Sequence, residues 1–128
     1  MRALLDTHVL LWWVVDAPRL SQRARHLLSN PGSEVYFSAA SSWELAIKFA
    51  LGRLTLPVPP RSFVPKILRE QSIRPLDVTH AHALAVAELP PQHRDPFDRL
   101  LVAQARLEKL AVVSGDPIFR EYGSKVIW

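Results

Sequence analysis

Four carboxylates stand at points of the sequence where metal-assisted chemistry could be assembled. They are Asp6, Glu44, Asp98 and Asp116. Carboxylate oxygens are the ligands that hard divalent cations such as Mg²⁺ and Mn²⁺ prefer. A cation held in this way can activate water and stabilise the charge that develops during phosphodiester hydrolysis. These residue types are therefore candidates for both metal binding and catalysis.

Three of the four acids also fit an ordinary role at the start of a helix. The segment 41–44 fits a capping box, with its first residue as the N-cap. Asp95 fits an N-cap that places Asp98 in the first helical turn, and Asp116 fits an N-cap followed by proline. Asp6 instead ends an apolar run and opens no clear cap. Capping explains single acids, but it does not explain why all four would share one edge.

The segments that must position these acids alternate between strands and helices. Short apolar or β-branched runs predict strands at residues 2–5, 35–38, 73–78, 110–113 and 125–128. Apolar spacings of three and four predict helices at residues 21–29, 41–51, 62–70, 79–89 and 97–109. This alternation predicts an α/β fold with a parallel sheet covered on both faces. Ligands of such sheets bind beyond the carboxyl ends of the strands, where we expect the four acids to meet.

Length and composition narrow the class of protein. The chain has 128 residues, which predicts a single domain over residues 1–128. It contains no cysteine, which excludes disulfide frameworks, thiolate zinc sites and cysteine nucleophiles. The longest strictly apolar run covers residues 9–15 and is too short to span a bilayer. No secretory signal is recognisable, so we expect a cytoplasmic protein without membrane association.

Charge indicates the class of substrate. The formal net charge is +4, and 12 of the 16 basic residues are arginine. Arginine suits bidentate contact with phosphate and stacks on bases. An acidic metal site surrounded by cations fits a nucleic acid better than a small acidic molecule, because neighbouring phosphates need contacts of their own.

Four segments resemble the PIN-domain ribonuclease family and occur in the family's order across nearly the whole chain. They are residues 6–12, 38–45, 95–105 and 114–119, with the sequences DTHVLLW, SAASSWEL, DPFDRLLVAQA and SGDPIF. The length and the tryptophan-bearing opening most resemble the VapC toxins of type II toxin–antitoxin pairs. The resemblance implies a three-layer α/β/α sandwich around a mainly parallel sheet of about five strands.

The same resemblance implies an activity and its partners. We expect a Mg²⁺- or Mn²⁺-dependent endoribonuclease that cuts structured RNA such as tRNA or ribosomal RNA. An activated water would attack phosphorus in line, the 3′ oxygen would leave, and no side chain would act as the nucleophile. Homodimers and a co-encoded antitoxin whose tail blocks the active site are also implied.

The resemblance assigns residues to this activity. It makes the four acids the catalytic and metal-binding quartet, and it gives Thr7 and Ser114 supporting hydrogen bonds through their hydroxyl groups. Arg99 lies beside Asp98 and is a candidate for phosphate contact. His8 lies close to the first acid and is a second candidate for substrate contact.

Two other functions fit part of the pattern. A haloacid-dehalogenase-type phosphatase also ends its first strand with Asp, but it requires a second Asp two residues later, where this chain has His8. A non-catalytic RNA-binding module on a PIN-like scaffold would also bind RNA, but the intact quartet argues against it. Turnover that depends on metal would separate the nuclease from the binding module.

The histidine pair and the tryptophans have several possible roles. His80 and His82 lie on different faces of the expected helix, so we expect them at the surface rather than on one metal. Trp12, Trp13 and Trp43 could stack on bases, bind a partner or pack in the core. Because Trp12 and Trp13 are adjacent, we expect at least one of them at a dimer or antitoxin interface.

Overall fold

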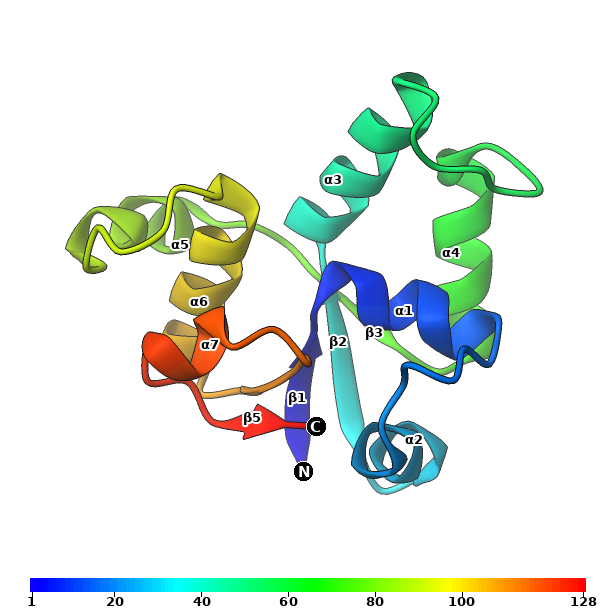
Figure 1. The fold of residues 1–128 in the computed structure, drawn as a ribbon, viewed down its shortest axis with the longest axis horizontal. Helices are drawn as coiled ribbons and strands as arrows, with labels where there is room; N and C mark the ends of the chain where they lie inside the picture. Colours follow the sequence, from blue (N-terminus) through cyan, green and yellow to red (C-terminus); the bar gives the residue numbers. More distant parts are fainter.

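The computed structural model describes all 128 residues and contains one five-stranded parallel sheet (Figure 1). The strands lie in the order β3-β2-β1-β4-β5, and Leu4 at the centre pairs with Tyr36 on one side and Val112 on the other. Their bounds are β1 Arg2–Leu5, β2 Glu34–Ser38, β3 Arg74–Leu76, β4 Ala111–Val113 and β5 Val126–Ile127. The structure therefore confirms the predicted parallel sheet.

Eight helical segments connect the strands. They are α1 Thr7–Val14, α2 Gln22–Ser29, α3 Ala39–Ala50, α4 Pro60–Glu70, α5 His80–Ala85, the 3₁₀ turn η1 Val86–Glu88, α6 Pro96–Glu108 and α7 Ile118–Glu121. Two of them, α1 and α7, are absent from the predicted set. The sequence of α1 is apolar almost all round and shows no helical period, and α7 is a single turn. None of the helices has the length and apolarity needed to cross a membrane.

The helices cover both faces of the sheet, and alternate strand residues point to different layers. Ala3 and Leu5 of β1 belong to a core shared with α1, α2 and α4. Leu4 belongs to the second core, with Leu101 of α6 and Phe119 of α7. In Figure 1 these two sets of helices lie on either side of the strands. The chain is thus the expected three-layer α/β/α sandwich.

The first turns of the helices differ in part from the predicted caps. Ser38, not Ser41, is the N-cap of α3, because β2 passes directly into the helix and the Ser38 hydroxyl accepts a hydrogen bond from Ala40 N at 3.0 Å. The predicted capping box over residues 41–44 is therefore wrong. Glu44 instead lies in the second turn and is free of a capping role.

The other two caps are closer to prediction. Asp95 caps α6, since its Oδ1 accepts hydrogen bonds from the backbone N–H of Phe97 and Asp98 at 2.9 and 3.3 Å. Asp116 Oδ1 accepts from Ile118 N at 3.0 Å, but the N-cap of α7 is Pro117, one residue later than the predicted cap at Asp116. Asp6 precedes α1 and makes no side-chain cap hydrogen bond.

A chain of polar side chains, here called the polar bridge, joins β2 to α5 and α6. It consists of Ser38, Gln104, His82 and Glu108. Gln104 Oε1 accepts from the Ser38 hydroxyl at 2.6 Å, and its amide nitrogen lies 3.3 Å from His82 Nδ1. His82 Nε2 lies 2.9 Å from Glu108 Oε1, and its ring is only 2% exposed. The expected surface position of His82 is therefore wrong, because α5 packs this face on α6.

Candidate active site

Asp6 and Ser114 lie at the point where the strand order reverses. Asp6 follows β1, Ser114 follows β4, and the connections that leave these neighbouring strands run in opposite directions across the sheet. The Ser114 hydroxyl donates to Asp6 Oδ2 at 2.7 Å, and Asp6 N donates to the Val113 carbonyl at 3.0 Å. Open α/β sheets bind ligands at this position.

Thr7 connects the first helix to Glu44. Thr7 Oγ1 lies 2.9 Å from Glu44 Oε1 and 2.8 Å from Ser41 Oγ. A hydroxyl has one proton, so Thr7 donates to the carboxylate and Ser41 donates to Thr7. Lys48 Nζ lies 2.7 Å from the other carboxylate oxygen of Glu44. Both oxygens of this buried acid are therefore held in place.

Ser41 and Lys48 were not among the predicted site residues. Lys48 could have been found from its position four residues after Glu44 on a helix, the spacing that favours an ion pair. Ser41 could not, because the sequence pattern assigned it to the helix cap. Only the packing of α1 against α3 brings its hydroxyl to Thr7.

Asp98 and Asp116 complete the group of acids from two further elements. Asp98 lies in the first turn of α6 and is half-buried, and its carboxylate makes no hydrogen bond or ion pair within the chain. Asp116 is exposed, and its backbone N–H donates to Ser114 Oγ at 3.0 Å. That hydroxyl therefore joins the Asp116 segment to Asp6.

The electrostatics show that the four acids share one edge of the sheet. The pKa of Asp98 is raised to about 7, first by burial and then by the carboxylates of Asp95, Asp6, Asp116 and Glu44, in that order. Burial also raises the pKa of Asp6, against the opposing effect of the Ser114 hydrogen bond. We call Asp6, Glu44, Asp98 and Asp116 the acidic edge. Within the chain Lys48 pairs with Glu44, and the other three carboxylates make no ion pair.

The acidic edge fits a hard divalent cation by the chemistry of its donors. All four residues offer carboxylate oxygens, and a cation would offset the repulsion that raises the pKa of Asp98. No group of three or more acidic or imidazole side chains is arranged to hold one ion by itself. Mg²⁺ usually keeps several waters and takes one or two carboxylates directly, which suits acids that are near but not converged.

The two candidates for substrate contact differ in their surroundings. His8 is exposed beside Asp6 and stacks on Trp12, with ring centroids 6.2 Å apart. The guanidinium of Arg99 is bound inside the chain. It donates to the carbonyls of Val86, Pro90 and His93 and to the hydroxyl of Tyr122, at 3.1, 2.8, 3.4 and 2.8 Å. Arg99 thus holds the segment before α6, and His8 stays open to a ligand.

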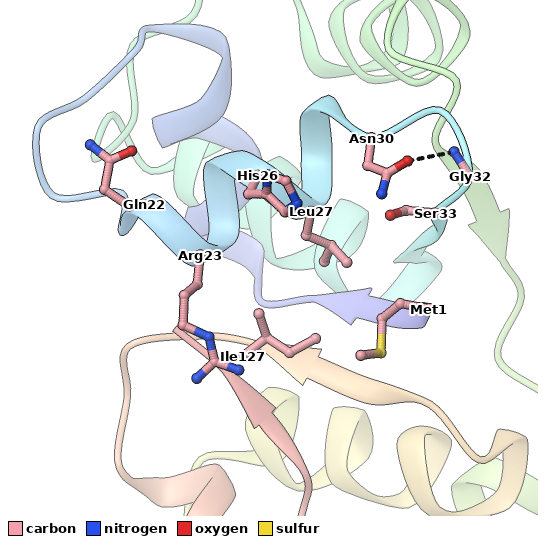
Figure 2. Close-up of a pocket in the computed structure, with 9 residues that line it drawn as sticks. All are labelled: Met1, Gln22, Arg23, His26, Leu27, Asn30, Gly32, Ser33 and Ile127. Atoms are coloured by element: carbon pink, nitrogen blue, oxygen red, sulfur yellow. Dashed lines mark hydrogen bonds between the residues drawn. The ribbon is translucent and has the colours of Figure 1, made fainter.

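A cavity of about 480 Å³ lies at the opposite edge of the sheet, beneath α2 (Figure 2). Met1 and Ser33, which precede β1 and β2, contribute to its wall together with Arg23 and His26. None of the residues that line it is acidic. This cavity is therefore separate from the acidic edge, which occupies the carboxyl ends of the strands.

Comparison with known proteins gives a consistent family. Residues 3–125 match the model of the PIN domain. The chain is 30% identical over 120 residues to Ribonuclease VapC22 of Mycobacterium tuberculosis, covering 93% of this chain and 90% of that protein. It is 41% identical over 69 residues to Ribonuclease VapC16 of the same organism, and this match spans about half of each protein, 51% and 49%.

Solved structures share the fold at low sequence identity. VapBC2 from Rickettsia felis, bound to a DNA fragment from its promoter, matches with a TM-score of 0.72 and 15% identity, covering 98% of this chain and 97% of that chain. FitAcB from Neisseria gonorrhoeae matches with a TM-score of 0.62 and 23% identity, covering 97% and 95%. These likenesses extend over the whole sandwich.

Proposed function

The chain belongs to the PIN-domain family, and we propose that it is a metal-dependent endoribonuclease that acts as the toxin of a toxin–antitoxin pair. The observation that carries this proposal is the acidic edge, where four carboxylates from separate elements lie together and where burial, followed by neighbouring carboxylates, raises the pKa of Asp98 to about 7. Carboxylates with a pKa raised in this way destabilise the fold, and they occur mainly at functional sites, where a bound ligand offsets that loss of stability. Both relatives that match by sequence are named as ribonucleases.

The cation would be Mg²⁺ or Mn²⁺, held by the acidic edge with water completing its shell. When bound, it supplies the positive charge that activates water and stabilises the developing charge on the phosphate. The chain itself orients the carboxylates. Ser114 fixes Asp6, Thr7 and Lys48 fix the two oxygens of Glu44, and the Asp95 cap fixes the turn that carries Asp98.

The substrate class we propose is structured RNA, with tRNA and ribosomal RNA as the first candidates. The basic balance of the chain, rich in arginine, supports a polyanion. His8 lies open beside Asp6 and could reach the RNA next to the reacting phosphate. Arg99 is assigned a structural role instead, because its donors are already used.

We also propose a cognate antitoxin and a homodimer. The similarity to two VapC ribonucleases and to the VapBC2 structure supports an antitoxin partner. Trp12 and Trp13 are only half-buried. Trp13 Nε1 donates to Gln71 Oε1 at 2.9 Å, and Trp12 lines an apolar cavity of about 230 Å³ between α1 and the segment before α4. That surface fits the interface role expected for the tryptophan pair.

The test is cleavage of a total pool of tRNA and ribosomal RNA by the purified chain, freed of any partner. We expect discrete fragments with Mg²⁺ or Mn²⁺, none with EDTA, and none with the Asp6→Asn variant. Glu70→Gln removes an exposed carboxylate on α4 and is the matched control that should cleave normally. RNA binding without cleavage by the wild-type chain would instead favour the binding module.

A further inference from the structure

One large aromatic side chain beside the acidic edge has no role in the core. Trp43 is 62% exposed, although indole is among the most apolar surfaces a side chain can offer. The next residue of α3, Glu44, is buried. The same turn of helix therefore directs an acid into the site and an aromatic ring toward solvent.

A second aromatic ring fixes the position of Trp43. Phe97 of α6 packs edge-on against the indole, with ring centroids 5.3 Å apart and an interplanar angle of 70°. Phe97 directly precedes Asp98, and its backbone N–H is held by the Asp95 cap. The pair thus joins α3 to α6, two helices that contact each other. Each ring is one residue away from an acid of the acidic edge.

We infer that Trp43, braced by Phe97, stacks on a nucleobase of the RNA next to the phosphate that is cleaved. This inference rests on the proposed function. The carboxylates of the acidic edge do not themselves bind RNA phosphates, so contacts with uncharged parts of the nucleotide help to hold the substrate there. An exposed indole beside carboxylates suits the face of a base, and stacking of this kind tolerates any base.

Stacking predicts that RNA binding weakens when either the Trp43 ring or the base that it contacts is removed. In an Asp6→Asn background, which should bind RNA without cutting it, Trp43→Ala should weaken binding of a short RNA by about 5- to 150-fold. Trp43→Phe should recover part of the loss, because it keeps an aromatic face. The matched control is Leu107→Ala, which truncates an exposed apolar side chain at the far end of α6 from Asp98.

Abasic RNA locates the contact. Removing the base that Trp43 contacts should weaken RNA binding about as much as Trp43→Ala does. Abasic RNA tested with the Trp43→Ala variant should lose no more affinity than either change causes alone. Additive losses at every abasic position, or unchanged binding by Trp43→Ala, would overturn the inference. So would a change from dimer to monomer in sedimentation that accounts for the whole loss, since Trp43 would then serve an interface between two copies.

The two proposals fail separately. Absence of cleavage by the wild-type chain would contradict the nuclease, but the binding measurements would still decide the role of Trp43. Normal cleavage combined with unchanged RNA affinity and KM in Trp43→Ala would contradict only the stacking. Circular dichroism of each variant verifies the fold, which an exposed side chain should not disturb.

Discussion

The acidic edge and the polar bridge both contain buried polar side chains, but their hydrogen-bonding needs are met differently. In the polar bridge, Gln104 accepts from Ser38 and donates to the Asp77 carbonyl and to His82. In the acidic edge, the Asp98 carboxylate has no partner, and its pKa is raised to about 7. One network satisfies itself, and the other is left with excess negative charge.

The difference separates a structural network from a candidate binding site. A buried polar group that finds its partners within the chain adds specificity to packing at little cost. Carboxylates crowded without a counter-charge reduce the stability of the fold until a ligand supplies that charge. Polarity and burial alone would not tell the two regions apart, whereas the balance of donors and charges does.

The largest expected effect comes from removing one charge of the acidic edge. Asp98→Asn should lower RNA cleavage by about a hundredfold or more, because it removes an electrostatic group from the reacting centre. Rates are measured on a single mapped RNA at saturating Mn²⁺. Asp77→Asn removes an exposed acid that follows β3 at the same end of the sheet, and it should cleave normally. Equal rates in both variants would show that the acidic edge is not the active site.

A second change acts on the acidic edge through a neighbour. Thr7→Val removes the hydroxyl that holds Glu44 and should raise the concentration of cation needed for half-maximal cleavage by about 10- to 100-fold. Thr7→Ser keeps a hydroxyl and should remain close to wild type. If the valine variant needs no more cation than wild type, the Thr7 hydrogen bond serves the fold alone.

The polar bridge should respond in stability rather than in activity. Gln104→Leu leaves Ser38 and the Asp77 carbonyl without their partner and should lower the free energy of unfolding by about 1–3 kcal/mol. Urea denaturation measures this loss, and the folded variant should still cleave RNA. The control Gln22→Leu lies at the exposed start of α2 and should change stability by less than about 0.5 kcal/mol. Loss of cleavage with unchanged stability would reverse the roles assigned to the two regions.

The smallest expected effect is a dependence of stability on pH. Because the folded-state pKa of Asp98 is raised from 3.8 to about 7, the fold favours its protonated form. That contribution is complete below pH 3.8 and is lost as the pH rises through about 7. In EDTA, Asp98→Asn should therefore gain stability over wild type from pH 5 to pH 8. Thermal melts measure the gain, which solvent screening of this half-buried group keeps small.

Addition of Mn²⁺ sharpens this last comparison. The cation should stabilise wild type more than Asp98→Asn at pH 8, because it offsets the charge that the variant lacks. The contrary result is that the stabilities of the two proteins differ by the same amount at every pH, with and without Mn²⁺. That result would show that the charge of Asp98 does not destabilise the fold.

Much of the fold and the general place of the acids could be predicted from the sequence. Short apolar or β-branched runs identified all five strands, and apolar spacings of three and four identified five of the helices. The α1 helix was missed because its sequence, apolar all round, has no polar face to mark a period. The predicted cap at Asp95 is confirmed, because a cap is a local interaction that the nearest residues decide.

What the sequence by itself determined is the alternation of strands and helices, and with it the edge that four acids share. What only the tertiary structure decided is which polar groups are paired across that edge. Ser41 hydrogen-bonds to Thr7 instead of capping the helix, and His82 is buried against Glu108 instead of lying at the surface. The Asp98 carboxylate has no partner within the chain, and its pKa is raised. Periodicity and capping are local, whereas burial and charge depend on segments far apart in the chain, so pairing is settled only when the layers pack.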